Sequence, residues 1–163
     1  MFEIIALIAN VSLALSFIVA LVFGIAQVRA AARDRRERLT LETLDKFETR
    51  EFAELIHYIN NKPLPSSQGE LDGLPENERV MVIQYAQQME SLGILVAEKF
   101  IDIDLVDKTL GSFVTTSWAK YKPVAQNLRE TEPFSMEYFQ WLAERIEQRM
   151  KEKPRKPFYQ DGH

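Results

Sequence analysis

Residues 4–28 read IIALIANVSLALSFIVALVFGIAQV, and this stretch decides how the rest of the chain is interpreted. Twenty of its 25 residues are apolar and none is charged. As an α-helix the stretch spans about 37 Å, which exceeds the roughly 30 Å hydrocarbon core of a bilayer. A soluble helix of this length is expected to show one polar face, and no face is strongly polar here. The stretch therefore predicts a transmembrane helix, which we assign to residues 1–28.

The flanking charges predict how this helix is oriented. A cleaved signal peptide has a basic start and a shorter apolar run, whereas this N-terminus carries Glu3 and no Lys or Arg. Residues 29–38 carry a net charge of +3, and positive flanks stay in the cytoplasm. We expect a single-pass membrane protein, with its N-terminus outside and its C-terminal domain cytoplasmic. The arginines of this segment are also candidates for contact with anionic lipid headgroups: Arg29, Arg33, Arg35, Arg36 and Arg38.

Small residues recur every fourth position in the apolar stretch, at Ser12, Ser16, Ala20 and Gly24. Such a stripe allows a second membrane helix to approach closely, and hydroxyl groups can form hydrogen bonds across the contact. Asn10 lies nearby and prefers a polar partner to lipid. These five residues predict association of the membrane helix, either with a second copy or with a partner protein.

The remaining chain shows helical periodicity and no two-residue alternation typical of strands. We predict an all-α protein: a juxtamembrane stalk helix at residues 29–47, a cytoplasmic domain of about four helices at residues 48–152, and a flexible tail at residues 153–163. Residues 60–75 read as a loop. Thr49, Asp102 or Asp104, and Ser135 are predicted helix N-caps. Gly93 is predicted to end one helix and Pro123 to kink or restart another.

Composition excludes several classes of function. The 163 residues include no Cys and two His, which excludes disulfides and thiolate metal sites and leaves little room for a histidine-rich one. Residues 39–163 hold 15 basic and 21 acidic residues, and this net charge of -6 repels nucleic acid. Glycine-rich phosphate loops, the serine-hydrolase elbow and the zinc-binding HExxH motif are absent. We therefore expect no cofactor, no metal and no nucleic-acid partner.

One pair of residues has catalytic character. Arg50 and His57 are seven residues apart, about 20° short of two helical turns, so they share one helix face. A His can move the proton of a ribose 2′-hydroxyl while an Arg stabilises the developing phosphorane charge. The pair resembles the Arg-x(4–6)-His motif of the HEPN ribonuclease superfamily, which implies metal-free RNA cleavage at a dimer interface. Glu51 departs from that motif, which is weak evidence at this length, and we favour the simpler explanation that Arg50 and His57 are solvated residues on a core helix.

A second resemblance covers nearly the whole chain. It rests on residues 44–47 with 50–52, and on the stretches MESLGILV at 89–96, SWAKYKPV at 117–124 and FQWLA at 139–143. The chain resembles a broad bacterial family of uncharacterised single-pass membrane proteins with a helical cytoplasmic domain. This resemblance implies that the membrane is the bacterial inner membrane. The layout is also similar to the membrane-pore accessory protein of type VI-B CRISPR systems.

The sequence leaves catalysis open and favours a non-enzymatic role. The leading hypothesis is a membrane-anchored helical module that self-associates or docks a partner at the cytoplasmic face, with the bilayer itself as one partner. The alternatives are a HEPN-like ribonuclease effector and an oligomeric membrane pore in bacterial defence. Asn10 and Ser12 lie about 200° apart on the helix, which disfavours a pore with a fully polar lumen.

Overall fold

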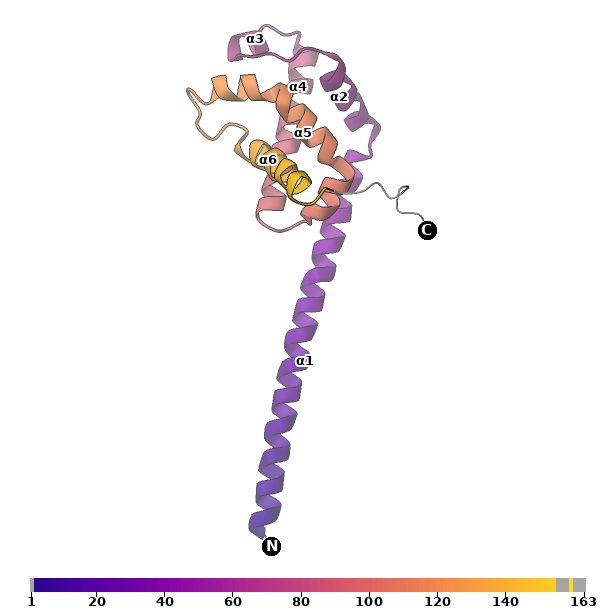
Figure 1. The fold of residues 1–163 in the computed structure, drawn as a ribbon, viewed down its shortest axis with the longest axis vertical. Coiled ribbons are helices and arrows are strands. Elements are labelled where there is room, and N and C mark those ends of the chain that lie inside the picture. Colours follow the sequence, from indigo (N-terminus) through magenta and orange to yellow (C-terminus); the bar gives the residue numbers. More distant parts are fainter. Residues whose placement is uncertain (1, 155–158, 160–163) are drawn as a thin grey trace. The chain divides into compact units, whose positions relative to one another are not determined.

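The computed structural model describes residues 2–154 and residue 159, and this part of the chain is helical without any strand. The predicted all-α fold, with a long apolar N-terminal helix followed by a helical bundle, is confirmed. The elements are shown in Figure 1: α1 (Phe2–Leu44), the 3-10 helix η1 (Asp45–Phe47), α2 (Arg50–Asn61), α3 (Gln68–Asp72), α4 (Glu76–Ala97), α5 (Ile103–Leu128) and α6 (Glu137–Glu152).

Helix α1 is one uninterrupted helix of 43 residues. The chain divides into two compact units, residues 1–38 and residues 39–163, so most of α1 forms the first unit by itself. The apolar side chains of this unit are exposed, for example Leu13 at 72% and Phe17 at 70%. Among the described residues, this is the one helix that is both long and apolar enough to cross a membrane.

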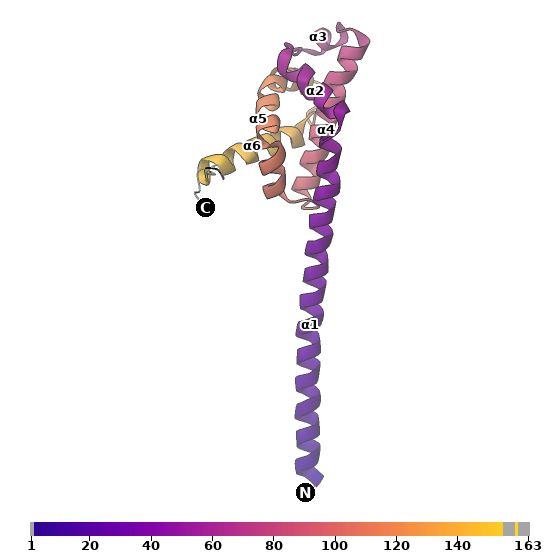
Figure 2. The same cartoon turned by 90° about the vertical axis from the view of Figure 1, so that its right-hand side faces the viewer.

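The second unit is a helical bundle with a column of aromatic rings through its core. The last turn of α1 belongs to it, because the buried Thr40 accepts a hydrogen bond from the backbone N–H of Asp102 at 2.9 Å. Figure 2 gives a second view of α4, α5 and α6, the three longest helices of this unit, and α6 packs against both α4 and α5. Successive rings have centroids 4.8 to 6.0 Å apart, in the order Phe47, Phe52, Tyr85, Tyr121, Phe139 and Trp118.

Helices α4 and α6 meet at an unusually close contact. Helix α4 continues through Gly93 to Ala97, so the prediction that Gly93 ends a helix is wrong. Gly93 instead lies against α6: a Cβ atom at this position would be 2.3 Å from the backbone oxygen of Tyr138. One turn earlier, the Glu90 carboxylate accepts hydrogen bonds from the backbone N–H groups of Tyr138 (3.2 Å) and Phe139 (2.8 Å).

The helix ends partly follow the sequence expectations. Thr49 and Asp102 cap α2 and α5 through their side chains, as predicted. The predicted cap at Ser135 is wrong, because α6 begins after Met136, which has left-handed backbone and no capping side chain. Here the carboxylate from α4 replaces the local cap. Helix α5 runs through Pro123 without a restart, and the short helix α3 lies in the segment predicted as a loop.

The stalk helix predicted to reach Phe47 ends at Leu44 and passes into η1. Of the predicted tail at residues 153–163, the structure describes Lys153, Pro154 and Tyr159, and the rest lies outside the described residues.

Candidate functional site

The exposed face of α2 carries the two residues with catalytic character. Arg50 and His57 line the same shallow depression of about 540 Å³ between α2 and α4. The Arg50 guanidinium Nε donates to Glu54 Oε1 at 2.8 Å, and its side chain is 92% exposed. His57 Nδ1 lies 3.2 Å from the Asn61 amide nitrogen. Each of the two side chains therefore pairs with the residue four positions further along α2.

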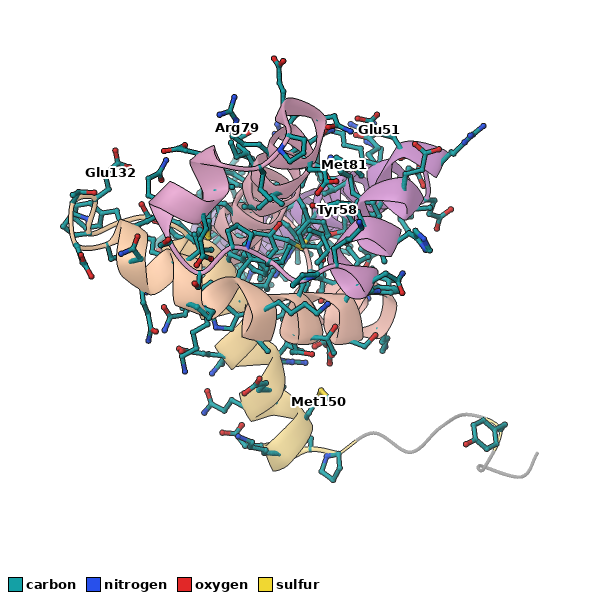
Figure 3. All side chains as sticks on the ribbon, turned by 90° about the horizontal axis from the view of Figure 1, so that it is seen from above. Glu51, Tyr58, Arg79, Met81, Glu132 and Met150 are labelled. Atoms are coloured by element: carbon teal, nitrogen blue, oxygen red, sulfur yellow. The ribbon has the colours of Figure 1, made fainter. Side chains whose placement is uncertain are left out.

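The walls of this depression are mostly carbon, and Tyr58 and Met81 form part of them (Figure 3). The Tyr58 hydroxyl donates to the Glu78 carboxylate at 2.7 Å. Burial, followed by this hydrogen bond, raises the pKa of Tyr58 to about 12, so the phenol stays neutral at physiological pH. Tyr58 therefore connects α2 to the first turn of α4 and is not an acid–base group near neutral pH.

Next to this depression, and sharing His57 with it, α2 borders an apolar groove of about 460 Å³, here called the α2–α5 groove. Its lining comes from the end of α1, η1, α2 and α5: Leu44, Phe47, Glu48, Phe52, Ala53, Ile56, His57, Asn60, Asn61, Thr109, Leu110 and Phe113. The Lys120 ammonium of α5 donates to the carbonyls of Ile59 and Asn60, at 2.7 Å each. This contact satisfies the carbonyl end of α2 and fixes it along α5.

A third depression, of about 440 Å³, is polar and lies between α5 and α6. Arg149 of α6 pairs with Asp104 in the first turn of α5, and Lys108 and Lys153 line the same depression. The ion pair joins the last turn of α6 to the start of α5. Positive and negative side chains are mixed here, so the depression has no uniform charge.

The residues predicted for membrane association lie along the exposed surface of α1. Ser16 donates its hydroxyl to the Ser12 carbonyl at 2.8 Å, so its proton is used within the helix. A Cβ atom on Gly24 would meet no atom within 4 Å. The stripe Ser12, Ser16, Ala20 and Gly24 thus offers a shallow surface, and Ser16 does not offer a free donor. Asn10 lies two residues before Ser12, about 200° from it around the helix.

The arginines predicted for lipid contact also lie on α1, in its part beyond the apolar segment. Arg33 pairs with Glu37 at 2.8 Å while remaining 80% exposed. Arg29, Arg35 and Arg38 are exposed, and Arg36 is partly buried. No group of three or more His, Cys, Asp or Glu side chains suited to a metal ion occurs in residues 2–154 and 159.

Comparison with protein families gives a match to a domain of unknown function over residues 12–146. The chain belongs to the DUF4760 family. The matched range begins inside the apolar part of α1 and extends to Ile146 in α6, so the family includes both units of this structure. No curated protein and no solved structure matches the chain. The predicted resemblance to an uncharacterised family is confirmed at this level.

The α2–α5 groove is the feature that the sequence did not reveal. Its apolar residues occur at ordinary helical spacing, which is also typical of a closed core. Phe113 is 37% exposed in the structure although it belongs to the stripe of core residues on α5. A sequence pattern shows which residues share a face, but not whether a neighbouring helix covers that face completely.

Proposed function

We propose that this DUF4760 protein is a non-enzymatic interaction module, anchored in the bacterial inner membrane by α1. The observation that carries the proposal is the 25-residue apolar segment at residues 4–28, whose large side chains are exposed. Transfer of one such side chain from water into lipid is favourable by about 1.5–3 kcal/mol. An α-helix satisfies its own backbone hydrogen bonds, as a membrane span requires.

The proposed orientation places the N-terminus outside and the helical domain in the cytoplasm. It is supported by the arginines of residues 29–38 and by the lack of Lys or Arg before the apolar segment. The guanidinium groups of the arginines in residues 29–38 follow the apolar segment directly, where anionic headgroups attract each charge by about 1 kcal/mol. Arg33 contributes less to this attraction because Glu37 already neutralises it.

The module assembles, in this proposal, through the stripe of small residues on α1, either with a second copy or with a partner's helix. The shallow surface at Ser12, Ser16, Ala20 and Gly24 lets two backbones approach closely. Asn10 lies about 200° around the helix from Ser12, and its amide benefits from a polar partner on that second face.

Sedimentation of the detergent-solubilised protein tests the assembly. Oligomers that dissociate on dilution are expected for the native chain, and Gly24→Leu should shift the equilibrium strongly to monomers. Ile18→Phe is the control, because it also adds bulk to the apolar segment but lies about 180° around the helix from the middle of the stripe. A monomer over a wide concentration range, or equal effects of the two variants, would contradict assembly through the stripe.

A second candidate function is a membrane-tethered HEPN-like ribonuclease. It is favoured by one observation, that Arg50 and His57 line one depression on an exposed helix face. The Glu54 carboxylate competes with a phosphate for Arg50, and the acidic domain opposes RNA, so this candidate ranks below the first. RNA cleavage that disappears in His57→Ala but persists in Asn60→Ala would establish it, and the absence of such cleavage would remove it.

An oligomeric pore of the kind suggested by the type VI-B CRISPR layout is a variant of the first proposal, in which the assembled helices surround a channel. Reconstituted liposomes that remain ion-tight would exclude this variant and leave the interaction module in place.

A further inference from the structure

The outward face of α4 is uncharged along most of its length. Residues 80–97 include one charged side chain, Glu90, and its carboxylate already accepts hydrogen bonds from the start of α6. A surface helix normally carries charged and polar side chains on the face that meets water. Depletion of charge is instead typical of the buried centre of a protein–protein interface. The outward face of α4 therefore has the composition of a surface that another molecule covers.

The exposed residues of this segment form one stripe, here called the α4 face. They lie at Gln87 and at four and seven residues to either side of it, within about 40° of Gln87 around the helix. Alternating steps of three and four residues are also the spacing by which two helices pack along a seam. The α4 face consists of Val80, Ile83, Gln87, Ser91 and Ile94. Val80 is 52% exposed, and Ile83 and Ile94 are each 39% exposed.

The α4 face matches a second copy of itself, because it is nearly symmetric about Gln87. Val80 and Ile94 lie seven residues away on the two sides, and the residues at four positions away are uncharged. A two-fold axis at Gln87 therefore brings uncharged side chains together whichever way the second helix runs. On that axis the Gln87 amide meets its own copy, and an amide group both donates and accepts hydrogen bonds. A single polar residue within an apolar seam also fixes the register of the two helices.

Charged side chains flank the α4 face at both ends. Glu76 and Arg79 lie at the start of α4, and Glu98 and Lys99 directly follow its end. Glu78 lies on the other side of the helix, where it accepts a hydrogen bond from α2. In a two-fold contact, each end then holds two acidic and two basic side chains. An uncharged centre with a charge-balanced rim fits a second copy better than a strongly charged partner.

We propose that α4 packs against α4 of a second copy of this chain, with Gln87 on the two-fold axis. Three apolar side chains per copy form a small contact, below the roughly 1,200 Å² of a stable interface. The contact therefore acts between copies that α1 already holds together, and in this respect it rests on the proposed assembly. Tethering raises the effective concentration of the second face to the millimolar range, at which a weak contact forms. The cytoplasmic domains thus pair when the membrane helices associate.

Disulfide formation between full-length chains in detergent tests the contact, because the chain has no Cys of its own. Gln87→Cys places one thiol on the proposed axis, next to the thiol of the second copy. Gln126→Cys is the matched control, since it is the same substitution at an exposed position of another helix, α5. Under mild oxidation, Gln87→Cys should form disulfide-linked dimers about tenfold faster than Gln126→Cys. Equal rates would overturn the proposal.

Gly24→Cys, measured in the same way, separates this contact from the assembly of α1. Dimers that form at Gly24 but not at Gln87 would overturn the α4 contact alone and leave the proposed assembly standing. Absence of dimers at both positions would overturn both. Dimers that form at Gln87 but not at Gly24 would support the α4 contact and contradict assembly through α1.

Two charge substitutions in the Gln87→Cys chain complete the test. Ile83→Asp should remove the tenfold advantage, because it buries a carboxylate in an uncharged contact. Phe113→Asp is the matched control, since Phe113 is 37% exposed on α5, outside the α4 face, and it should leave the advantage intact. Circular dichroism checks the fold, and Ile94→Asp takes the place of Ile83→Asp if the latter unfolds. An advantage that survives the charge on the α4 face, or that Phe113→Asp removes instead, would overturn the proposal.

Discussion

The contact between α4 and α6 yields a sharp prediction for Gly93→Ala. In an isolated helix this substitution is favourable by about 1 kcal/mol. In this structure the new Cβ would lie 2.3 Å from the backbone oxygen and 2.7 Å from the backbone carbon of Tyr138. These are backbone atoms that cannot rotate away, so the start of α6 must move by about 1 Å to reach an ordinary contact of 3.4 Å.

This displacement has two costs. Overpacking of a core contact costs about 1–3 kcal/mol. The movement also weakens the hydrogen bonds from Tyr138 and Phe139 to the Glu90 carboxylate, and loss of a helix N-cap costs about 1 kcal/mol. After subtraction of the helix-propensity gain, we expect Gly93→Ala to lower the free energy of unfolding of the domain by about 1–3 kcal/mol.

Urea unfolding of the detergent-solubilised protein measures this change, with Trp118 and Trp141 as the fluorescent reporters. Gly69→Ala is the matched control, because Gly69 also lies in a helix and a Cβ there would meet no atom within 4 Å. The control should unfold like the native chain or slightly later. If the free energy of unfolding of Gly93→Ala lies within about 0.5 kcal/mol of that of Gly69→Ala, α4 and α6 do not make the close contact at Gly93.

Three further predictions concern other contacts of the domain. Lys120→Met removes both hydrogen bonds to the end of α2 and should destabilise the domain by about 1–2 kcal/mol in the same urea assay, whereas the exposed Lys122→Met should have little effect. Burial raises the pKa of Tyr85 from 10.0 to about 12. The neutral phenol therefore stabilises the fold fully below pH 10, and this stabilisation is lost as the pH rises from 10 to 12. Tyr85→Phe should make the free energy of unfolding fall less steeply between pH 10 and pH 12, and an unchanged slope would show that Tyr85 is not the group responsible. His57→Ala should leave urea stability within about 0.5 kcal/mol of the native value, because His57 is exposed, and a larger loss would give it a structural role.

Local sequence signals predicted the elements whose causes are local. The uncharged apolar run predicts a helix from composition alone, and Thr49 and Asp102 act as caps because each side chain reaches a backbone N–H two or three residues ahead. Ser135 failed as a cap because Glu90, which precedes Tyr138 by 48 residues and Phe139 by 49, satisfies their backbone N–H groups at the start of α6. A sequence taken alone does not show which carboxylate will meet which helix end.

Gly93 illustrates the same limit for packing. A glycine near the end of an apolar stripe is typical of a helix terminus, but here it marks the place where a second helix crosses closely. The candidate site was predictable to the same degree. Periodicity placed Arg50 and His57 on one face of α2, but it did not reveal the pairing of Arg50 with Glu54 or the open groove between α2 and α5.

The central claim is that residues 4–28 remain in the mature protein as a membrane span, with the domain in the cytoplasm. Single cysteines in this Cys-free chain, labelled with a membrane-impermeant maleimide, test it most directly. We predict that Glu3→Cys reacts in intact cells and that Glu130→Cys reacts only after the membrane is permeabilised. Labelling of Glu130→Cys in intact cells, or a mature chain that has lost its N-terminal segment, would contradict the account.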